Sequence, residues 1–189
     1  MKTIDNLLTM DTETGGLHSD TDALMSITMK VYGKDEIKTI YIKPQKKLNY
    51  TYKALEVNGI TMDFLDENGI SEIDAIGEIV KFVDKHYEKK PSLLGQNINF
   101  DIGFLDALFE RNKMHSFSGL TYHQKRDTQA VSRFFQDAGF DIEKVNLTDA
   151  YKFFTGLELK DAHSSEADVL ATEALYKAQI DLLQTIKEE

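Results

Sequence analysis

The sequence has no cysteine and only two prolines in 189 residues. Without cysteine, neither a disulfide framework nor a thiolate metal site is possible, and we expect a cytoplasmic protein in a reducing compartment. No apolar run approaches the ~20 residues of a membrane-spanning helix, so no membrane partner is expected. The first residues also lack the basic and apolar segments of a signal peptide.

Internal repeats, low-complexity tracts and linkers rich in proline or glycine are also missing. The length suits one ordinary domain, so we expect a single domain over residues 1–189. A formal net charge of −10 argues against a basic nucleic-acid-binding face. A nuclease that gathers carboxylates around divalent cations is a permitted exception, because the metal supplies the positive charge.

The pattern of apolar residues predicts an α/β fold. Strands are expected at residues 4–13, 24–32 and 37–42, and the breaks between them favour an antiparallel meander. Two further strands are expected at residues 93–95 and 119–122. Helices are expected at residues 73–83, 100–111, 147–154 and 165–186, and around 131–135. This order predicts a mixed five-stranded sheet flanked by helices.

Asp11 and Glu13 lie two positions apart on the first expected strand. Side chains at this spacing share one face of a strand, and both carboxylates can reach one cation. Like charges on an otherwise apolar strand raise each other's pKa unless a cation neutralises them. A solvated strand end is the alternative explanation of this pair.

Asp101 is a second acid in an unexpected place. A helical projection sets it within the apolar stripe that contains Phe104, Leu105 and Leu108. A carboxylate at such a position needs a partner or a metal ion. The alternative is a first-turn acid that interacts favourably with the helix dipole.

His163 and Asp168 form a third candidate pair. They can converge if His163 lies in the loop before the last helix and Asp168 lies in its first turns. Ser165 is then the expected N-cap, although Ser165 and Asp168 also fit a capping box. Four acids and one histidine form an oxygen-dominated set, which suits Mg²⁺ or Mn²⁺.

Three segments together resemble the exonuclease motifs of the DnaQ-like, or DEDDh, 3′→5′ exonuclease family. They are residues 11–17 (DTETGGL), 97–105 (NINFDIGFL) and 163–172 (HSSEADVLAT). Two lesser segments agree with it, at residues 57–61 (VNGIT) and 126–128 (RDT). The sister group that uses tyrosine would have it at position 164, where Ser164 stands.

The resemblance implies a ribonuclease H-like sheet with three antiparallel strands and then two parallel ones. It implies a two-metal exonuclease that releases nucleoside 5′-monophosphates from the 3′ end of single-stranded nucleic acid, with DNA favoured. The implied metal ligands for two Mg²⁺ or Mn²⁺ ions are Asp11, Glu13, Asp101 and Asp168. The implied general base is His163. The implied substrate contacts are Thr14, Leu17, Ile60, Asn97 and Phe100.

Some positions depart from the family pattern. Gln96 and Asn58 stand where histidine is common, Ser165 replaces a frequent alanine, and Gly15-Gly16 replaces a Thr-Gly pair. None is an implied metal ligand, so these departures bear on substrate preference more than on activity.

Three alternatives stay open at this point. The enzyme can trim DNA or RNA, because no residue that reads the ribose 2′-hydroxyl is identifiable. A silent binding module on the same fold, docking a DNA polymerase or another protein, is a rival outside the enzyme class, although the complete set of five residues argues against it. The chain ends at Glu189 soon after the last expected helix, which favours a stand-alone nuclease over a polymerase subunit.

Overall fold

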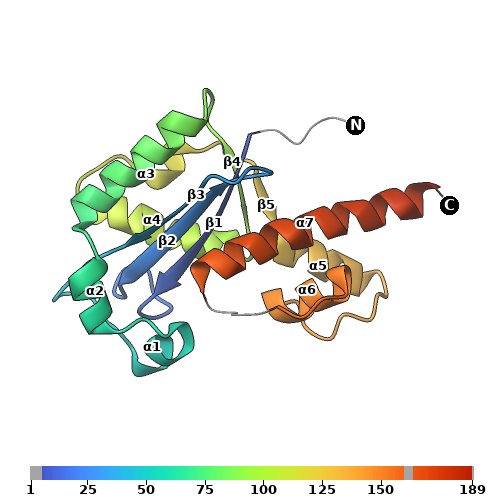
Figure 1. Cartoon of the computed structure of the whole chain (residues 1–189), viewed down its shortest axis with the longest axis horizontal. Helices are drawn as coiled ribbons and strands as arrows, with labels where there is room; N and C mark the ends of the chain where they lie inside the picture. Colours follow the sequence, from blue (N-terminus) through green and yellow to red (C-terminus); the bar gives the residue numbers. More distant parts are fainter. Residues whose placement is uncertain (1–5, 160–163, 189) are drawn as a thin grey trace.

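The computed structural model describes residues 6–159 and 164–188, and a five-stranded sheet with the order β3-β2-β1-β4-β5 forms its centre (Figure 1). The strands are β1 (Leu7–Thr14), β2 (Leu24–Val31), β3 (Ile37–Tyr41), β4 (Ser92–Gly95) and β5 (Lys125–Asp127). The first three pair antiparallel, whereas β4 is parallel to β1 and β5 is parallel to β4. The expected mixed sheet is therefore confirmed.

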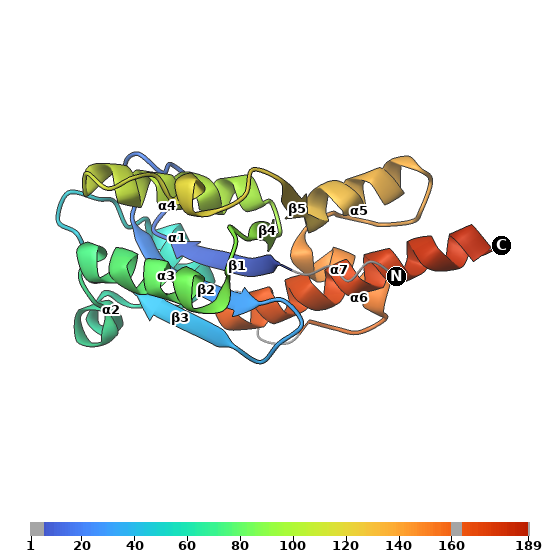
Figure 2. The same ribbon diagram turned by 90° about the horizontal axis from the view of Figure 1, so that it is seen from above.

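Helices cover both faces of this sheet. They are α1 (Tyr52–Asn58), α2 (Met62–Asn68), α3 (Glu72–His86), α4 (Ile98–Arg111), α5 (Thr128–Asp137), α6 (Leu147–Thr155) and α7 (Ser165–Glu188). Figure 2 shows α3 and α4 on one side of the sheet and α7 on the other. Because β2 is covered on both faces, all eight of its residues are buried. The main hydrophobic core forms between the sheet and the α3–α4 layer.

One expected strand was wrong. Residues 117–120 form a 3-10 turn, η1 (Phe117–Leu120), and the fifth strand is β5. Strand β5 is a three-residue edge strand that buries little surface, so it needs no apolar residue, and its sequence Lys125-Arg126-Asp127 has none. A search for apolar runs could not have found it.

Two short helices between β3 and α3 were not expected. Thr51 and Thr61 cap the N-termini of α1 and α2 through their hydroxyls. Helix α1 buries none of its residues and α2 buries only Leu65, so neither has the apolar stripe that reveals a helix in a sequence.

The first strand also differs in its bounds. It was expected at residues 4–13, whereas β1 spans Leu7–Thr14. Residues 4 and 5 lie outside the described part.

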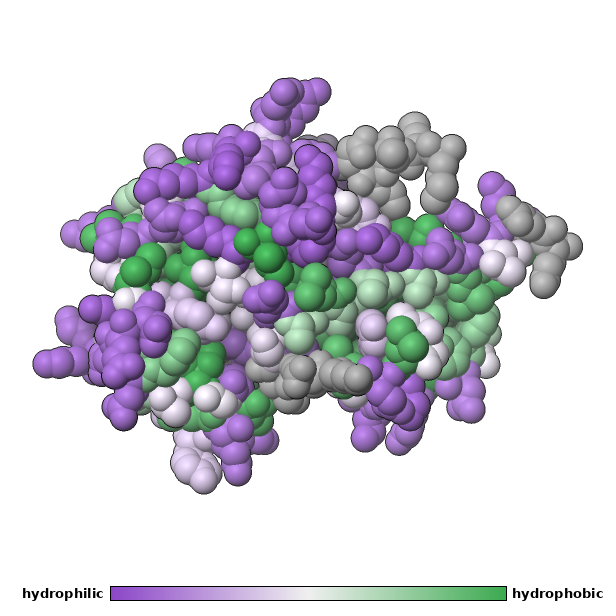
Figure 3. Space-filling view, in the orientation of Figure 1, coloured by the Kyte–Doolittle hydropathy of each residue, from purple (hydrophilic) through white to green (hydrophobic). Residues whose placement is uncertain are grey.

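A smaller hydrophobic cluster joins α5, α6 and the C-terminal half of α7. Phe135, Ile142 and Val145 are its buried members, and Leu182 of α7 packs against them. Figure 3 shows hydrophobic surface over α5 and α6, below the C-terminal part of α7. In the described part of the chain, no helix is long and apolar enough to span a bilayer.

Candidate active site

The carboxyl end of β1 carries two acids beyond the point where the neighbouring strand stops. Strand β4 pairs with β1 only through residues 7–9, so Asp11 and Glu13 lie past its end. Alternation along the strand directs both side chains to one face of the sheet. The pairing of β1 with β2 also shifts register between Glu13 and Thr14. Such irregularities re-aim side chains at the ends of strands.

Helix α7 brings a third acid to the same place. Asp168 is the fourth residue of α7, which packs on β1, β2 and β4. One carboxylate oxygen from each of Asp11, Glu13 and Asp168 lies within 4.8 Å of the other two. All three side chains are partly buried. Three carboxylates this close form an oxygen cage of the kind that binds a hard divalent cation.

Asp101 approaches from the opposite layer. It lies in the first turn of α4 and is only 3% exposed, so its expected burial is confirmed. Its Oδ1 atom accepts a hydrogen bond of 2.7 Å from the hydroxyl of Thr12. Asp101 does not belong to the set of oxygens within 4.8 Å, so it borders the three acids rather than joining them.

The acids perturb one another strongly. Burial, followed by the charges of Asp168 and Asp101, raises the pKa of Glu13 to about 8. Burial also raises the pKa of Asp11 well above its usual value, and the charges of Asp101, Glu13 and Asp168 add to the effect. Burial raises the pKa of Asp101, although its bond from Thr12 acts in the other direction. A bound cation would relieve this repulsion, because it favours the ionised form of each carboxyl group.

The start of α7 is fixed to the sheet by hydroxyl groups. Ser165 is the first residue of α7, not the residue before it, so its expected role as N-cap was wrong. Its buried hydroxyl is hydrogen-bonded to that of Thr28 in β2, with 2.8 Å between the oxygens. The expected general base, His163, lies outside the described residues.

A hollow of about 500 Å³ opens beside Glu13. Its walls combine the end of β1, the loop that follows it and helix α1. The lining residues are Glu13, Thr14, Gly16, Leu17, His18, Asp22, Thr51, Lys53, Ala54, Val57 and Asn58. Leu17 is 78% exposed, so the hollow has a large apolar side chain at its surface that a ligand can contact. Its volume suits a small ligand such as one nucleotide.

Two of the expected substrate contacts, Thr14 and Leu17, line this hollow. Ile60 lies just beyond α1 and outside the lining, where Val57 and Asn58 stand instead. Asn58 donates to the carbonyl of Thr14 over 3.3 Å, so at the position of a common family histidine it ties α1 to β1.

The other two expected contacts lie at the start of α4. Asn97 precedes the helix in a left-handed conformation, and its backbone N–H donates to Asp127 Oδ1 over 3.0 Å. The ring of Phe100 lies 5.0 Å from that of Phe104, and Phe100 packs against the main core. Neither residue lines the hollow.

Positions 15 and 16 have no room for a side chain, which explains the glycine at each. A β-carbon on Gly15 would lie 2.4 Å from the carbonyl oxygen of Asn49, and one on Gly16 would lie 2.1 Å from Asp22 Oδ2. The loop is thus packed against the segment that leads to α1, and a threonine at position 15 would force that segment away.

Sequence reasoning did not identify Thr12, His18 or Lys53 as parts of this region. Strand alternation points Thr12 away from its acidic neighbours, and nothing in the sequence links Lys53 to residues 40 positions earlier. Lys53 lines the same hollow as Glu13 because α1 lies against the end of β1.

Comparisons with known proteins show a family and a shared fold. A family model described as Exonuclease (RNase_T) matches residues 8–176, which is most of the chain. Two solved structures of E. coli Exonuclease I are similar in fold. The complex with a dT13 oligonucleotide has a TM-score of 0.79 at 23% identity, over 96% of this chain and 43% of that chain. The complex with a dA16 oligonucleotide has a TM-score of 0.78 at 24% identity, over 92% and 40%.

A zinc-bound form of the E. coli ExoI–ssDNA complex has a TM-score of 0.77 at 23% identity, over 96% of this chain and 43% of that chain. The chain therefore spans less than half the length of these solved structures. At this level of identity, the likeness shows a shared fold.

Proposed function

This chain belongs to the RNase_T exonuclease family, as its resemblance to the DnaQ-like exonucleases predicted. On that premise, we propose that it is a metal-dependent 3′→5′ exonuclease that removes nucleoside 5′-monophosphates from single-stranded nucleic acid. The observation that carries the proposal is the set of three carboxylates, from Asp11, Glu13 and Asp168, within 4.8 Å of one another at the end of the central strand.

The carboxylate donor set fits divalent cations, and we propose that it holds two. Oxygen-only ligands suit Mg²⁺ and Mn²⁺, and the raised pKa of Glu13 shows how costly the cluster is without a positive charge. Asp11, Glu13 and Asp168 would hold the ions, with Asp101 beside them acting partly through water. Bound cations supply a more acidic water and stabilise the charge that develops on the phosphate.

The chain's own residues would perform the remaining tasks. His163 would take the proton from the attacking water, since an imidazole with a pKa near neutrality suits a general base. Thr14 and Leu17 would contact the terminal nucleotide in the hollow beside Glu13, near Asn58 and Val57. Ile60, Asn97 and Phe100 are the other proposed substrate contacts, and they lie outside the lining of that hollow.

Single-stranded DNA is the favoured substrate. The similar E. coli Exonuclease I structures hold dT13 and dA16 oligonucleotides, and we extend this preference to the present chain. RNA trimming by the same site is the second candidate. A silent binding module that docks a DNA polymerase is the third, and the retention of three closely spaced acids argues against it.

The test uses four oligonucleotides of one sequence: single-stranded DNA and RNA, each labelled at either the 5′ or the 3′ end. With Mg²⁺ or Mn²⁺, we expect 5′-labelled strands to give a ladder that shortens from the 3′ end, and 3′-labelled strands to release labelled mononucleotide first. Excess chelator should stop both reactions. Cleavage of a circular single strand, or undiminished cleavage after chelation, would contradict the proposal.

A further inference from the structure

Thr12 lies between the two acids of β1, yet its side chain points the other way. Alternation along the strand directs Asp11 and Glu13 to the α7 side and Thr12 to the α4 side. Thr12 is 8% exposed, and a buried hydroxyl needs a hydrogen-bond partner. That partner comes from a distant part of the chain.

The partner is Asp101, 89 residues further along. The Thr12 hydroxyl donates to Asp101 Oδ1 over 2.7 Å, a short distance typical of a bond to an ionised carboxylate. The contact is possible because β4 pairs with β1 only as far as Thr9. Helix α4 begins at Ile98, soon after β4 ends at Gly95, and it contacts β1.

Asp101 borders the carboxylate cluster. It is buried, and its hydrogen-bond partner Thr12 stands in β1 between Asp11 and Glu13. The backbone N–H groups of Thr12 and of Asp101 itself also lie close enough to lower the pKa of this carboxyl, and the Thr12 hydroxyl has the largest effect of the three. Among side chains of the described residues, Thr12 donates the hydrogen bond that orients this buried acid.

We propose that Thr12 is a positioning residue, which holds Asp101 in the orientation that the metal site requires. This inference rests on the proposed function, because it assigns Thr12 a role at the same site. Strand formation and burial do not explain a threonine here, since valine has nearly the same shape and suits a buried strand better. Threonine adds a hydroxyl donor to Asp101 that valine lacks, whereas the backbone N–H of position 12 is the same in both.

The test is Mn²⁺ binding to the substrate-free protein, measured by electron paramagnetic resonance. Thr12→Val keeps the shape of the side chain and removes the donor, and we expect it to weaken Mn²⁺ binding about 10- to 100-fold, as loss of a ligand's hydrogen-bond partner typically does. Thr12→Ser keeps the donor and should bind Mn²⁺ like the wild type. Half-maximal cleavage should require correspondingly more Mg²⁺ in Thr12→Val.

Thr9→Val is the matched control on the same strand. The Thr9 hydroxyl is buried and makes no hydrogen bond in the described part of the chain, so its loss should leave Mn²⁺ affinity unchanged. The double variant Thr12→Val/Asp101→Ala should bind Mn²⁺ like Asp101→Ala alone, because alanine removes the oxygen that accepts from Thr12 and Thr12 acts through that carboxylate.

Two results would overturn the inference: wild-type Mn²⁺ affinity in a folded Thr12→Val, or an additive loss in the double variant. If Thr12→Val does not fold, the serine variant decides, because weakened Mn²⁺ binding in folded Thr12→Ser would equally contradict the role of the hydroxyl. A wild-type protein that binds Mn²⁺ but cleaves no nucleic acid would instead refute the proposed function.

Discussion

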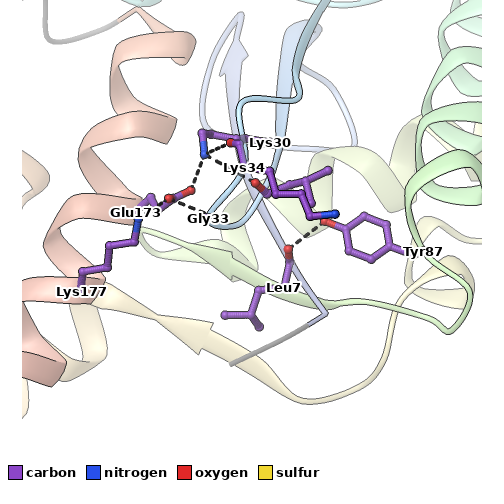
Figure 4. Close-up of polar contacts among 8 residues, drawn as sticks. Leu7, Lys30, Gly33, Lys34, Tyr87, Glu173 and Lys177 are labelled. Atoms are coloured by element: carbon purple, nitrogen blue, oxygen red, sulfur yellow. Dashed lines mark hydrogen bonds and ion pairs between the residues drawn. The ribbon is translucent and has the colours of Figure 1, made fainter. Parts of the chain in front are cut away.

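Lys30 of β2 and Glu173 of α7 form a buried ion pair, with 2.7 Å between Nζ and Oε2 (Figure 4). Their side chains are only 8% and 7% exposed. Lys30 also donates to the carbonyl of Lys34, and the backbone N–H of Gly33 donates to Glu173 Oε1. The pair therefore ties the β2–β3 turn to α7, five residues after Asp168.

Glu173→Ala should lower the free energy of unfolding by about 3–5 kcal/mol, because it leaves the Lys30 ammonium buried without its counter-ion. Lys177 also pairs with Glu173, but its side chain is 49% exposed, so Lys177→Ala should cost less than about 1 kcal/mol. Urea denaturation measures both. Replacing the pair together, as Lys30→Met/Glu173→Leu, should recover much of the loss. A cost below about 1 kcal/mol for Glu173→Ala would show that the pair does not hold α7.

The metal-free protein should become less stable as the pH rises from about 5 to 8. Folding raises the pKa of Glu13 from 4.5 to about 8, so between these values the folded state binds more protons than the unfolded state. The cost of ionising Glu13 is absent below the lower pKa and complete above the upper one. Mg²⁺ binds the ionised form, so it should stabilise the protein more at pH 8.5 than at pH 6.

Thermal unfolding in chelator, with Glu13→Gln as the reference, isolates this contribution. The glutamine variant does not titrate, so it should unfold at a higher temperature than the wild type at pH 8.5 and at nearly the same temperature below pH 5. Equal melting temperatures of the two proteins at pH 8.5 would show that Glu13 is not strained in the metal-free site.

Changes at His163 and Asp11 should have different effects. His163→Ala should lower turnover by about 10²–10⁴-fold, the usual contribution of a general base, and leave binding of single-stranded substrate nearly unchanged. Asp11→Asn should lower metal affinity and turnover together, since it removes a carboxylate that is proposed to bind both cations. Single-turnover rates and Mn²⁺ titrations separate the two cases. Wild-type turnover in His163→Ala at neutral pH and saturating Mg²⁺ would remove this histidine from the mechanism.

Much of the candidate site could be predicted from the sequence because acids on apolar elements are conspicuous. Asp11 and Glu13 stand on a buried strand, and Asp101 interrupts the apolar stripe of α4. Periodicity therefore marks them as candidates without knowledge of the fold, and the resemblance to the exonuclease motifs implied their role as metal ligands. The same reasoning gave the central strands and long helices, whose buried faces leave a clear pattern.

The remainder depends on contacts between distant segments. In the sequence, Lys30 is a charged residue on a strand and suggests an exposed position. In the structure it is buried, and its ammonium group pairs with Glu173 of α7. In the sequence, Thr12 is only the residue between two acids. Its hydrogen bond to Asp101 depends on the folded arrangement, in which β4 pairs with β1 only as far as Thr9 and Asp101 lies in the first turn of α4. Strand β5 and helix α1 bury too few apolar side chains to leave any pattern.

Lys53 should contribute to binding through the phosphate backbone. Among the described residues that line the hollow beside Glu13, Lys53 is the lysine, and its ammonium group can pair with a phosphate. The chain as a whole has a net charge of −10. Loss of one phosphate contact should reduce the slope of log affinity against log salt by about 0.7 for a single strand. We therefore expect Lys53→Gln to bind single-stranded DNA more weakly at low salt and with a smaller slope.

Fluorescence anisotropy in Ca²⁺ measures this binding, since Ca²⁺ should fill the oxygen cage with little turnover. Lys46→Gln is the control, because Lys46 is exposed and does not line the hollow. An unchanged slope in Lys53→Gln would exclude Lys53 as a phosphate contact.

The most direct test of a metal-dependent 3′→5′ exonuclease is the product formed in ¹⁸O-labelled water. Mass spectrometry should follow a 5′-labelled single strand digested by the wild-type protein with Mg²⁺. We expect nucleoside 5′-monophosphates that each carry one ¹⁸O on phosphorus, together with 5′-labelled fragments that shorten one nucleotide at a time. Nucleoside 3′-monophosphates, or loss of the 5′ label in the first product, would contradict this expectation.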